Sequence, residues 1–79
     1  MISAYIMILA APGSGNGIVK ELRKIEQIEN TAVITGEYDI VVRVTVDNVQ
    51  KLADITDTIN AIKGVSKTHT HVIMRELRV

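Results

Sequence analysis

Two histidines, His69 and His71, are the side chains of this sequence best suited to bind a metal ion or to change charge near neutral pH. They stand two positions apart, so in a regular strand both would point to the same face. With the carboxylate of Glu37 or Asp39 nearby they could hold zinc or another divalent ion, but such histidines are more often solvated or interfacial. The sequence therefore predicts no metal site and no cofactor. A pH-sensitive interface stays open as an alternative, because paired imidazolium ions across a symmetry axis would repel each other.

No arrangement of nucleophile and base predicts catalysis. Ser66 lies three positions before His69, which in a strand puts the two side chains on opposite faces. The glycine-rich residues 12–17 match neither a phosphate-binding loop nor the full dinucleotide fingerprint. We therefore expect that the protein is not an enzyme.

The composition indicates a small domain that associates with copies of itself. Seventy-nine residues predict one domain, spanning 1–79, with a thin core of its own. There is no cysteine, so disulfides and thiolate zinc sites cannot stabilise it. Nearly half of the residues are apolar, but Tyr5 and Tyr38 are the only aromatic ones. Burial of aliphatic surface against another subunit is the remaining means of stabilisation.

The charges argue against nucleic acid and membrane as partners. Nine basic and nine acidic residues balance, without the basic face that phosphate binding requires. The longest apolar stretch, residues 5–11, is too short to span a bilayer and has no basic region before it. We therefore expect a cytoplasmic protein.

The first half of the chain reads as strand, helix, strand. Residues 2–11 are apolar on both alternations, which predicts a strand covered on both faces. A turn at residues 12–16 leads to an amphipathic helix over 17–27. Residues 31–35 form the next strand, and Gly36-Glu37-Tyr38 is a hairpin connection in which glycine supplies a positive φ.

The second half reads as strand, helix, strand. Four alternating aliphatic residues in 40–46 predict a strand with one buried face. Asp47 is the expected N-cap of the following helix, with Gln50 completing a capping box, and Gly64 is its expected C′ residue. The stripe of this helix consists of Leu52, Ile55, Ile59 and Ile62. Residues 65–79 form a last strand, long enough that a bend or a bulge is expected.

This order predicts an α+β, ferredoxin-like βαββαβ domain. Its four-stranded antiparallel sheet carries both helices on one face, because both crossovers are right-handed. The opposite face still presents Tyr5, Met7 and Leu9. An apolar patch of this kind predicts that a second subunit packs there.

Two segments of the second half resemble a known family. They are TGEYDIVVRVTVDN and, after the second helix, GVSKTHTHVIMREL. Together they resemble the effector-sensing domain of the Lrp/AsnC transcription regulators, called the RAM domain, and the opening strand and helix also fit it. The matching positions are Gly36, Tyr38, Asp39, Arg43, Val44, Gly64, Val65, Thr68 and Thr70.

The resemblance implies an assembly and a ligand site. In this family the sheets of two subunits face each other, dimers join into rings, and small effectors, typically amino acids, bind between dimers near the hairpin turn. Carried over to this sequence, the ligand site consists of Gly36, Glu37, Tyr38 and Asp39, facing Thr68 and Thr70 of a neighbouring chain. Free backbone N–H groups of the turn could bind a carboxylate, and an aspartate could accept from an ammonium group.

The resemblance also bears on DNA. Full-length regulators carry an N-terminal helix-turn-helix, whereas this sequence begins at the first strand, so we expect a stand-alone module that does not read DNA itself. The predicted function is amino-acid sensing that regulates transcription indirectly, by ligand-dependent assembly or by association with full-length Lrp/AsnC-type regulators. The alternative is a small dimeric ferredoxin-like barrel enzyme of monooxygenase type, although few aromatic residues are available to line its pocket.

Overall fold

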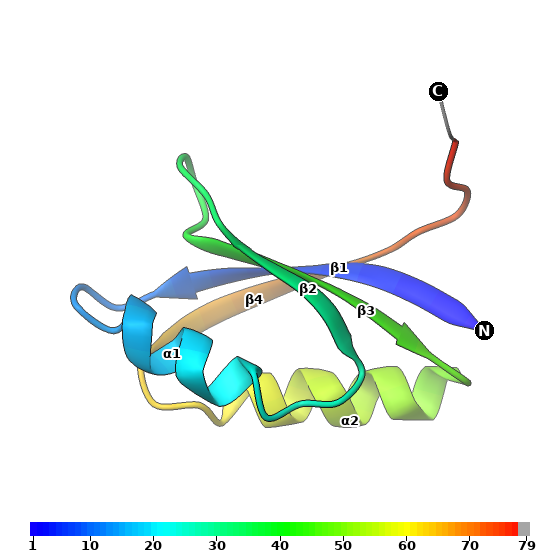
Figure 1. Ribbon diagram of the computed structural model, residues 1–79, viewed down its shortest axis with the longest axis horizontal. Coiled ribbons are helices and arrows are strands. Elements are labelled where there is room, and N and C mark those ends of the chain that lie inside the picture. Colours follow the sequence, from blue (N-terminus) through cyan, green and yellow to red (C-terminus); the bar gives the residue numbers. More distant parts are fainter. Residues whose placement is uncertain (78–79) are drawn as a thin grey trace.

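The predicted order of strands and helices is confirmed in the computed structural model, which describes residues 1–77. Figure 1 labels the elements. They are β1 (Ile2–Ala10), α1 (Gly15–Leu22), β2 (Ile28–Val33), β3 (Ile40–Val46), α2 (Val49–Asn60) and β4 (Val65–Val72).

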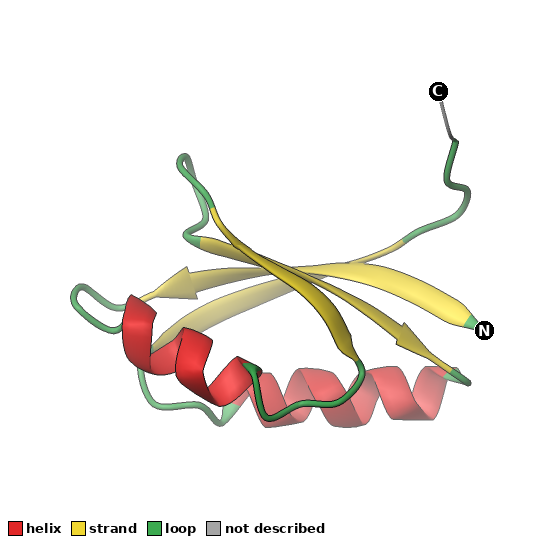
Figure 2. Cartoon of the chain, in the orientation of Figure 1, coloured by secondary structure: helices red, strands yellow, loops and turns green. Residues whose placement is uncertain are grey.

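The four strands form one antiparallel sheet in the order β2-β3-β1-β4, so β1 and β3 are central and β2 and β4 are edges. The pairing of β1 with β3 runs from Ile2 opposite Val46 to Ile8 opposite Ile40. Both helices lie on the same side of this sheet, and the other side is open in the described chain (Figure 2). This is the predicted ferredoxin-like arrangement.

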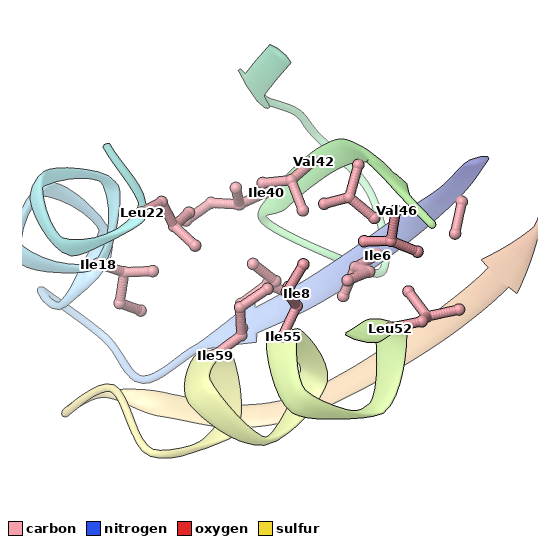
Figure 3. Close-up of a cluster of buried hydrophobic side chains, with 12 residues drawn as sticks. Ile6, Ile8, Ile18, Leu22, Ile40, Val42, Val46, Leu52, Ile55 and Ile59 are labelled. Atoms are coloured by element: carbon pink, nitrogen blue, oxygen red, sulfur yellow. The ribbon is translucent and has the colours of Figure 1, made fainter. Parts of the chain in front are cut away.

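The core lies between the sheet and the two helices, where side chains from both layers meet (Figure 3). Alternate residues of β3 are buried, as their spacing predicts, because successive side chains of a strand point to opposite faces. The buried hydrophobic residues are Ala4, Ile6, Ile8, Ile18, Leu22, Ile40, Val42, Val44, Val46, Leu52, Ile55 and Ile59.

The first helix and the second strand differ from the predicted bounds. The helix occupies Gly15–Leu22 rather than 17–27, and the chain then turns through hydrogen bonds from Ile25 N to Leu22 O and from Ile28 N to Ile25 O. Ile25 still packs against the core, which explains why it fitted the helical stripe. The second strand begins at Ile28 rather than at residue 31, because its pairing with β3 already starts with Ile28 opposite Val44.

The two ends predicted for the second helix were wrong. Its N-cap is Asn48 and not Asp47, since the Asn48 side chain accepts a hydrogen bond from Lys51 N at 2.9 Å. The helix ends at Asn60, so Gly64 lies beyond its C-cap Ala61. Gly64 does have a positive φ of 97°, and a Cβ there would stand 2.4 Å from Ser14 Cβ. The close approach of the loop before α1 therefore requires glycine as well.

The last strand is shorter than predicted. It ends at Val72, and residues 78 and 79 of the predicted strand lie outside the described residues. The irregularity expected in the last strand is present: Leu9 of β1 pairs with Lys67 and Ala10 with Val65, so β4 carries one extra residue, Ser66, where the register shifts. Beyond Val72 the chain rises on the side of the sheet away from the helices (Figure 1).

Candidate functional site: the open sheet face and its hairpin

The face of the sheet without helices, here called the open face, combines apolar and titratable side chains. On β1, Tyr5 stands between Arg43 of β3 and His71 of β4, and Met7 stands between Val41 and His69. Tyr5 is 40% exposed, while Met7 and Leu9 are half-buried. The three predicted interface residues therefore share one accessible face.

Residues 34–39 form the hairpin connection between β2 and β3, which is longer than the three residues predicted. A hydrogen bond from Ile34 N to Asp39 O, 2.8 Å long, closes it. Gly36 has a φ of 117°, a conformation that residues with a side chain rarely adopt. The predicted need for glycine in this connection is confirmed.

Asp39 fastens the base of the hairpin to the end of β1. Its Oδ2 accepts a hydrogen bond from Ala10 N at 2.8 Å, and its own N–H donates to Ile8 O at 3.0 Å. The carboxylate thus accepts a hydrogen bond from the backbone of β1 at the point where the pairing of β1 with β4 shifts register. Asp39 therefore has a structural role whether or not a ligand binds.

Tyr38 links the hairpin to the far edge of the sheet. Its hydroxyl lies 2.6 Å from His69 Nδ1, and the two ring centroids are 5.4 Å apart. His69 in turn lies edge-on to His71, with ring centroids 6.2 Å apart. The predicted common face of the two histidines is confirmed, but their connection to Tyr38 has no signal in the sequence because it joins residues 31 positions apart.

The two threonines of the predicted site lie on the other face of the sheet. Thr68 and Thr70 stand opposite the buried residues Ile8 and Ile6 of β1. Thr68 Oγ1 donates to Asn60 Oδ1 of α2 at 3.0 Å. Within one chain they do not meet the hairpin, so the prediction that they contribute to the site requires a neighbouring chain.

An ion-pair cluster that the sequence did not predict occupies one end of the open face. Arg43 of β3 forms ion pairs with Glu29 of β2 and with Glu76 in the C-terminal segment. The hydrogen bond to Glu76 is the main cause that raises the pKa of Arg43, and the charges of both carboxylates add to it. Thr45 donates to Glu29, and Ser3 bonds to Thr45 at 2.9 Å. The cluster therefore fastens the C-terminal segment to the sheet.

The described residues 1–77 contain no group of three or more His, Cys, Asp or Glu side chains that could hold a metal ion. Neither of the helices within them is long and apolar enough to cross a membrane. A groove of about 650 Å³ lies where the C-terminal segment leaves the open face, and its lining includes Tyr5, His71, Met74 and Leu77.

Comparison with known families identifies the family to which this domain belongs. A model of the Lrp/AsnC ligand binding domain matches residues 3–78, and the chain belongs to this family. The HTH-type transcriptional regulator FL11 of Pyrococcus furiosus is 31% identical over 74 residues, which are 94% of this chain and 49% of the regulator. The chain thus spans about half the length of the curated regulators it matches.

Solved structures share the fold over the whole chain. The protein TTHA0845 from Thermus thermophilus is 26% identical, has a TM-score of 0.91 and is matched over the full length of both chains. The feast or famine regulatory protein Rv3291c from M. tuberculosis, a complex with L-methionine, is 24% identical with a TM-score of 0.87. The match covers 100% of this chain and 54% of that one, and at this identity it shows the fold alone.

An enzyme also contains a related segment. Homocitrate synthase of Sulfurisphaera tokodaii is 32% identical over 60 residues, which are 76% of this chain but 13% of the enzyme. Segments similar to this domain therefore occur both in transcriptional regulators and in an enzyme.

Proposed function

We propose that residues 1–79 act as one effector-sensing module that forms a homo-oligomer, binds an amino acid and regulates transcription indirectly. Regulation would follow from ligand-dependent assembly or from association with full-length regulators of the same family. The observation that carries this proposal is the open face, which leaves one side of the central strand β1 accessible.

Assembly is supported by the side chains that this face presents. Tyr5, Met7 and Leu9 alternate along β1 with residues that are fully buried under the helices. A second copy packed face to face would remove the exposed apolar area from water, at roughly 25 cal/mol per Å². A small domain with a thin core gains more from this burial than a large one.

Ligand binding is supported by the hairpin. Within residues 1–77, the backbone N–H groups of Gly36, Glu37 and Tyr38 donate to no protein acceptor, so they are available to a carboxylate. Asp39 uses Oδ2 for Ala10 N, which leaves its other oxygen for an ammonium group. The methionine complex of the M. tuberculosis protein is consistent with an amino acid as the effector. Thr68 and Thr70 of a neighbouring chain would complete the site.

Native mass spectrometry, with and without the twenty amino acids, tests both parts of the proposal. We expect even-numbered assemblies that retain one kind of amino acid. Asp39→Asn keeps an acceptor for Ala10 N but removes the negative charge, and we expect it to weaken binding at least tenfold without unfolding the protein. Asp47→Asn, at the exposed residue directly after β3, is the matched control. A monomer would contradict assembly, and equal affinity of the two variants would contradict the role of Asp39.

Association with full-length regulators has its own test. A mixture with a family member that carries a helix-turn-helix should elute as one complex in size-exclusion chromatography. Separate elution at micromolar concentrations would contradict mixed assembly and leave ligand-dependent self-assembly as the mechanism.

A second candidate is that the module senses an effector for an enzyme rather than for a promoter. The segment of homocitrate synthase that resembles this chain favours it, because the same kind of domain there accompanies catalysis. An enzyme partner predicts that the effector changes the rate of that partner in a purified mixture. No change in rate at saturating effector would contradict it. The curated regulators among the relatives favour either sensing role over the monooxygenase-type alternative.

A further inference from the structure

We propose that His69 and His71 form a two-histidine chelate for a divalent transition-metal ion of the zinc, nickel or copper type, with Tyr38 as its positioning residue. The proposal departs from the sequence-based prediction of no metal site. The metal site shares Tyr38 with the predicted amino-acid site, but it uses the tyrosine hydroxyl rather than the backbone N–H and does not require that an amino acid binds.

The backbone places both imidazoles on one face. Positions i and i+2 of a strand point to the same side, and His69 and His71 stand opposite Met7 and Tyr5 of β1. Both histidines are exposed in the single chain and stand on the edge strand β4, so an ion can reach them from the edge of the sheet. Their ring centroids are 6.2 Å apart, whereas a tetrahedral ion with Zn–N bonds of about 2.0–2.1 Å holds two such centroids roughly 5 Å apart. The two rings would therefore have to move about 1 Å closer together for both to bind one ion, which we expect from rotation of the exposed side chains.

Tyr38 prepares one of the two ligands. Its hydroxyl occupies His69 Nδ1 at 2.6 Å, so Nε2 is the nitrogen left for an ion. When Nε2 binds a metal, Nδ1 carries the proton and donates it to the tyrosine oxygen, which fixes both the tautomer and the ring orientation. Outer partners of this kind raise the basicity and the order of a metal-binding histidine. The contact thus has the form of a metal ligand with its supporting hydrogen bond.

The chemistry of the ligands limits the ion. Imidazole nitrogen suits zinc, nickel and copper and is a poor ligand for calcium and magnesium, which prefer oxygen. One chain supplies two protein ligands among its described residues, so water or a group from a second copy fills the remaining positions. Because β4 is an edge strand, the two histidines stand at the rim of the open face, where a second copy could also contribute.

The composition of the chain simplifies a test of metal binding. The chain has two histidines and no cysteine, so no other imidazole or thiolate can bind the probe. Zinc chloride is titrated into the whole chain while the two histidine ring C2–H signals are followed by proton NMR. We expect both signals to shift together and saturate at the same zinc concentration, in the micromolar range. If neither signal moves, or if only one does, the chelate is wrong.

Variants assign the ligands. His69→Gln and His71→Gln should each weaken zinc binding at least tenfold in isothermal titration calorimetry, because one imidazole alone cannot chelate. Tyr38→Phe should weaken it by roughly tenfold through loss of the supporting hydrogen bond, and unchanged affinity would contradict the positioning role of Tyr38. Glu21→Gln, on α1, is the control and should bind as the parent does. Unchanged affinity in either histidine variant would overturn the proposal, and circular dichroism of each variant confirms that it is folded.

Discussion

The two faces of β1 differ in burial, although both belong to the same strand. Ala4, Ile6 and Ile8 are completely buried under the helices, whereas Tyr5 between them is 40% exposed on the open face. Both sets are apolar, so hydrophobicity alone does not distinguish them. The difference is that the described chain provides two helices and places both on one side (Figure 2).

The helix-covered face stabilises the single chain, whereas the open face is the surface through which we propose that chains associate. The helix-covered face is closed by residues of the same chain, so its burial contributes to folding at any concentration. No helix among the described residues covers the open face, so burial of this face by a second copy, as proposed, would contribute to stability in a way that depends on protein concentration. Substitutions on the two faces should therefore behave differently.

The largest effect is expected from Ile6→Ala compared with Met7→Ala. Ile6 is fully buried, and its truncation should lower the free energy of unfolding by about 2–5 kcal/mol, a large share for a domain of this size. Met7→Ala should instead reduce self-association and leave the stability of the dilute protein nearly unchanged. Urea denaturation at several protein concentrations, with analytical ultracentrifugation, distinguishes the two. Equal losses of stability that do not vary with protein concentration would contradict the proposed difference between the two faces.

A smaller effect is expected at Gly36 and Gly64, two of the three glycines with positive φ among the described residues. Gly36→Ala meets no neighbour within 4 Å and should cost of order 1–3 kcal/mol from backbone strain alone. Gly64→Ala should cause the same kind of backbone strain and, in addition, a steric clash, because the added Cβ would lie 2.4 Å from Ser14 Cβ. Thermal denaturation should therefore show a larger loss for Gly64→Ala. The reverse order would mean that the loop before α1 moves away easily.

The smallest effect concerns the start of α2, which covers the buried face. Asn48→Ala removes the acceptor for Lys51 N and should cost about 1 kcal/mol. Asp47→Ala removes the residue that the sequence favoured and should change the free energy of unfolding by less than about 0.5 kcal/mol. Chemical denaturation of both variants decides between the two caps. A larger loss of stability for Asp47→Ala would instead support Asp47 as the N-cap, as the sequence predicted.

The elements were predictable because their spacing carries the information. Alternate aliphatic residues in β3 and the stripe of Leu52, Ile55 and Ile59 in α2 are local patterns, and the structure buries them as expected. The element ends were less predictable. Asp47 and Asn48 are both good N-cap residues, and only the path of the chain from β3 into α2 selects Asn48.

The candidate site was predictable in part. The glycine of the hairpin and the common face of His69 and His71 follow from local rules, and both are found. The side of the sheet on which Thr68 and Thr70 lie also follows from alternation, but their placement relative to the hairpin involves a neighbouring chain. That part remains a prediction.

The sequence by itself determined the order of strands and helices, the layer of helices on one face and the apolar surplus on the other, because periodicity and composition are local properties. The tertiary structure decided the contacts between distant residues: Asp39 with Ala10, Tyr38 with His69, and Arg43 with Glu29 and Glu76. These contacts depend on the register of neighbouring strands and on the direction in which the C-terminal segment leaves the sheet. Both are set by packing of the whole domain, and no short stretch of sequence contains them.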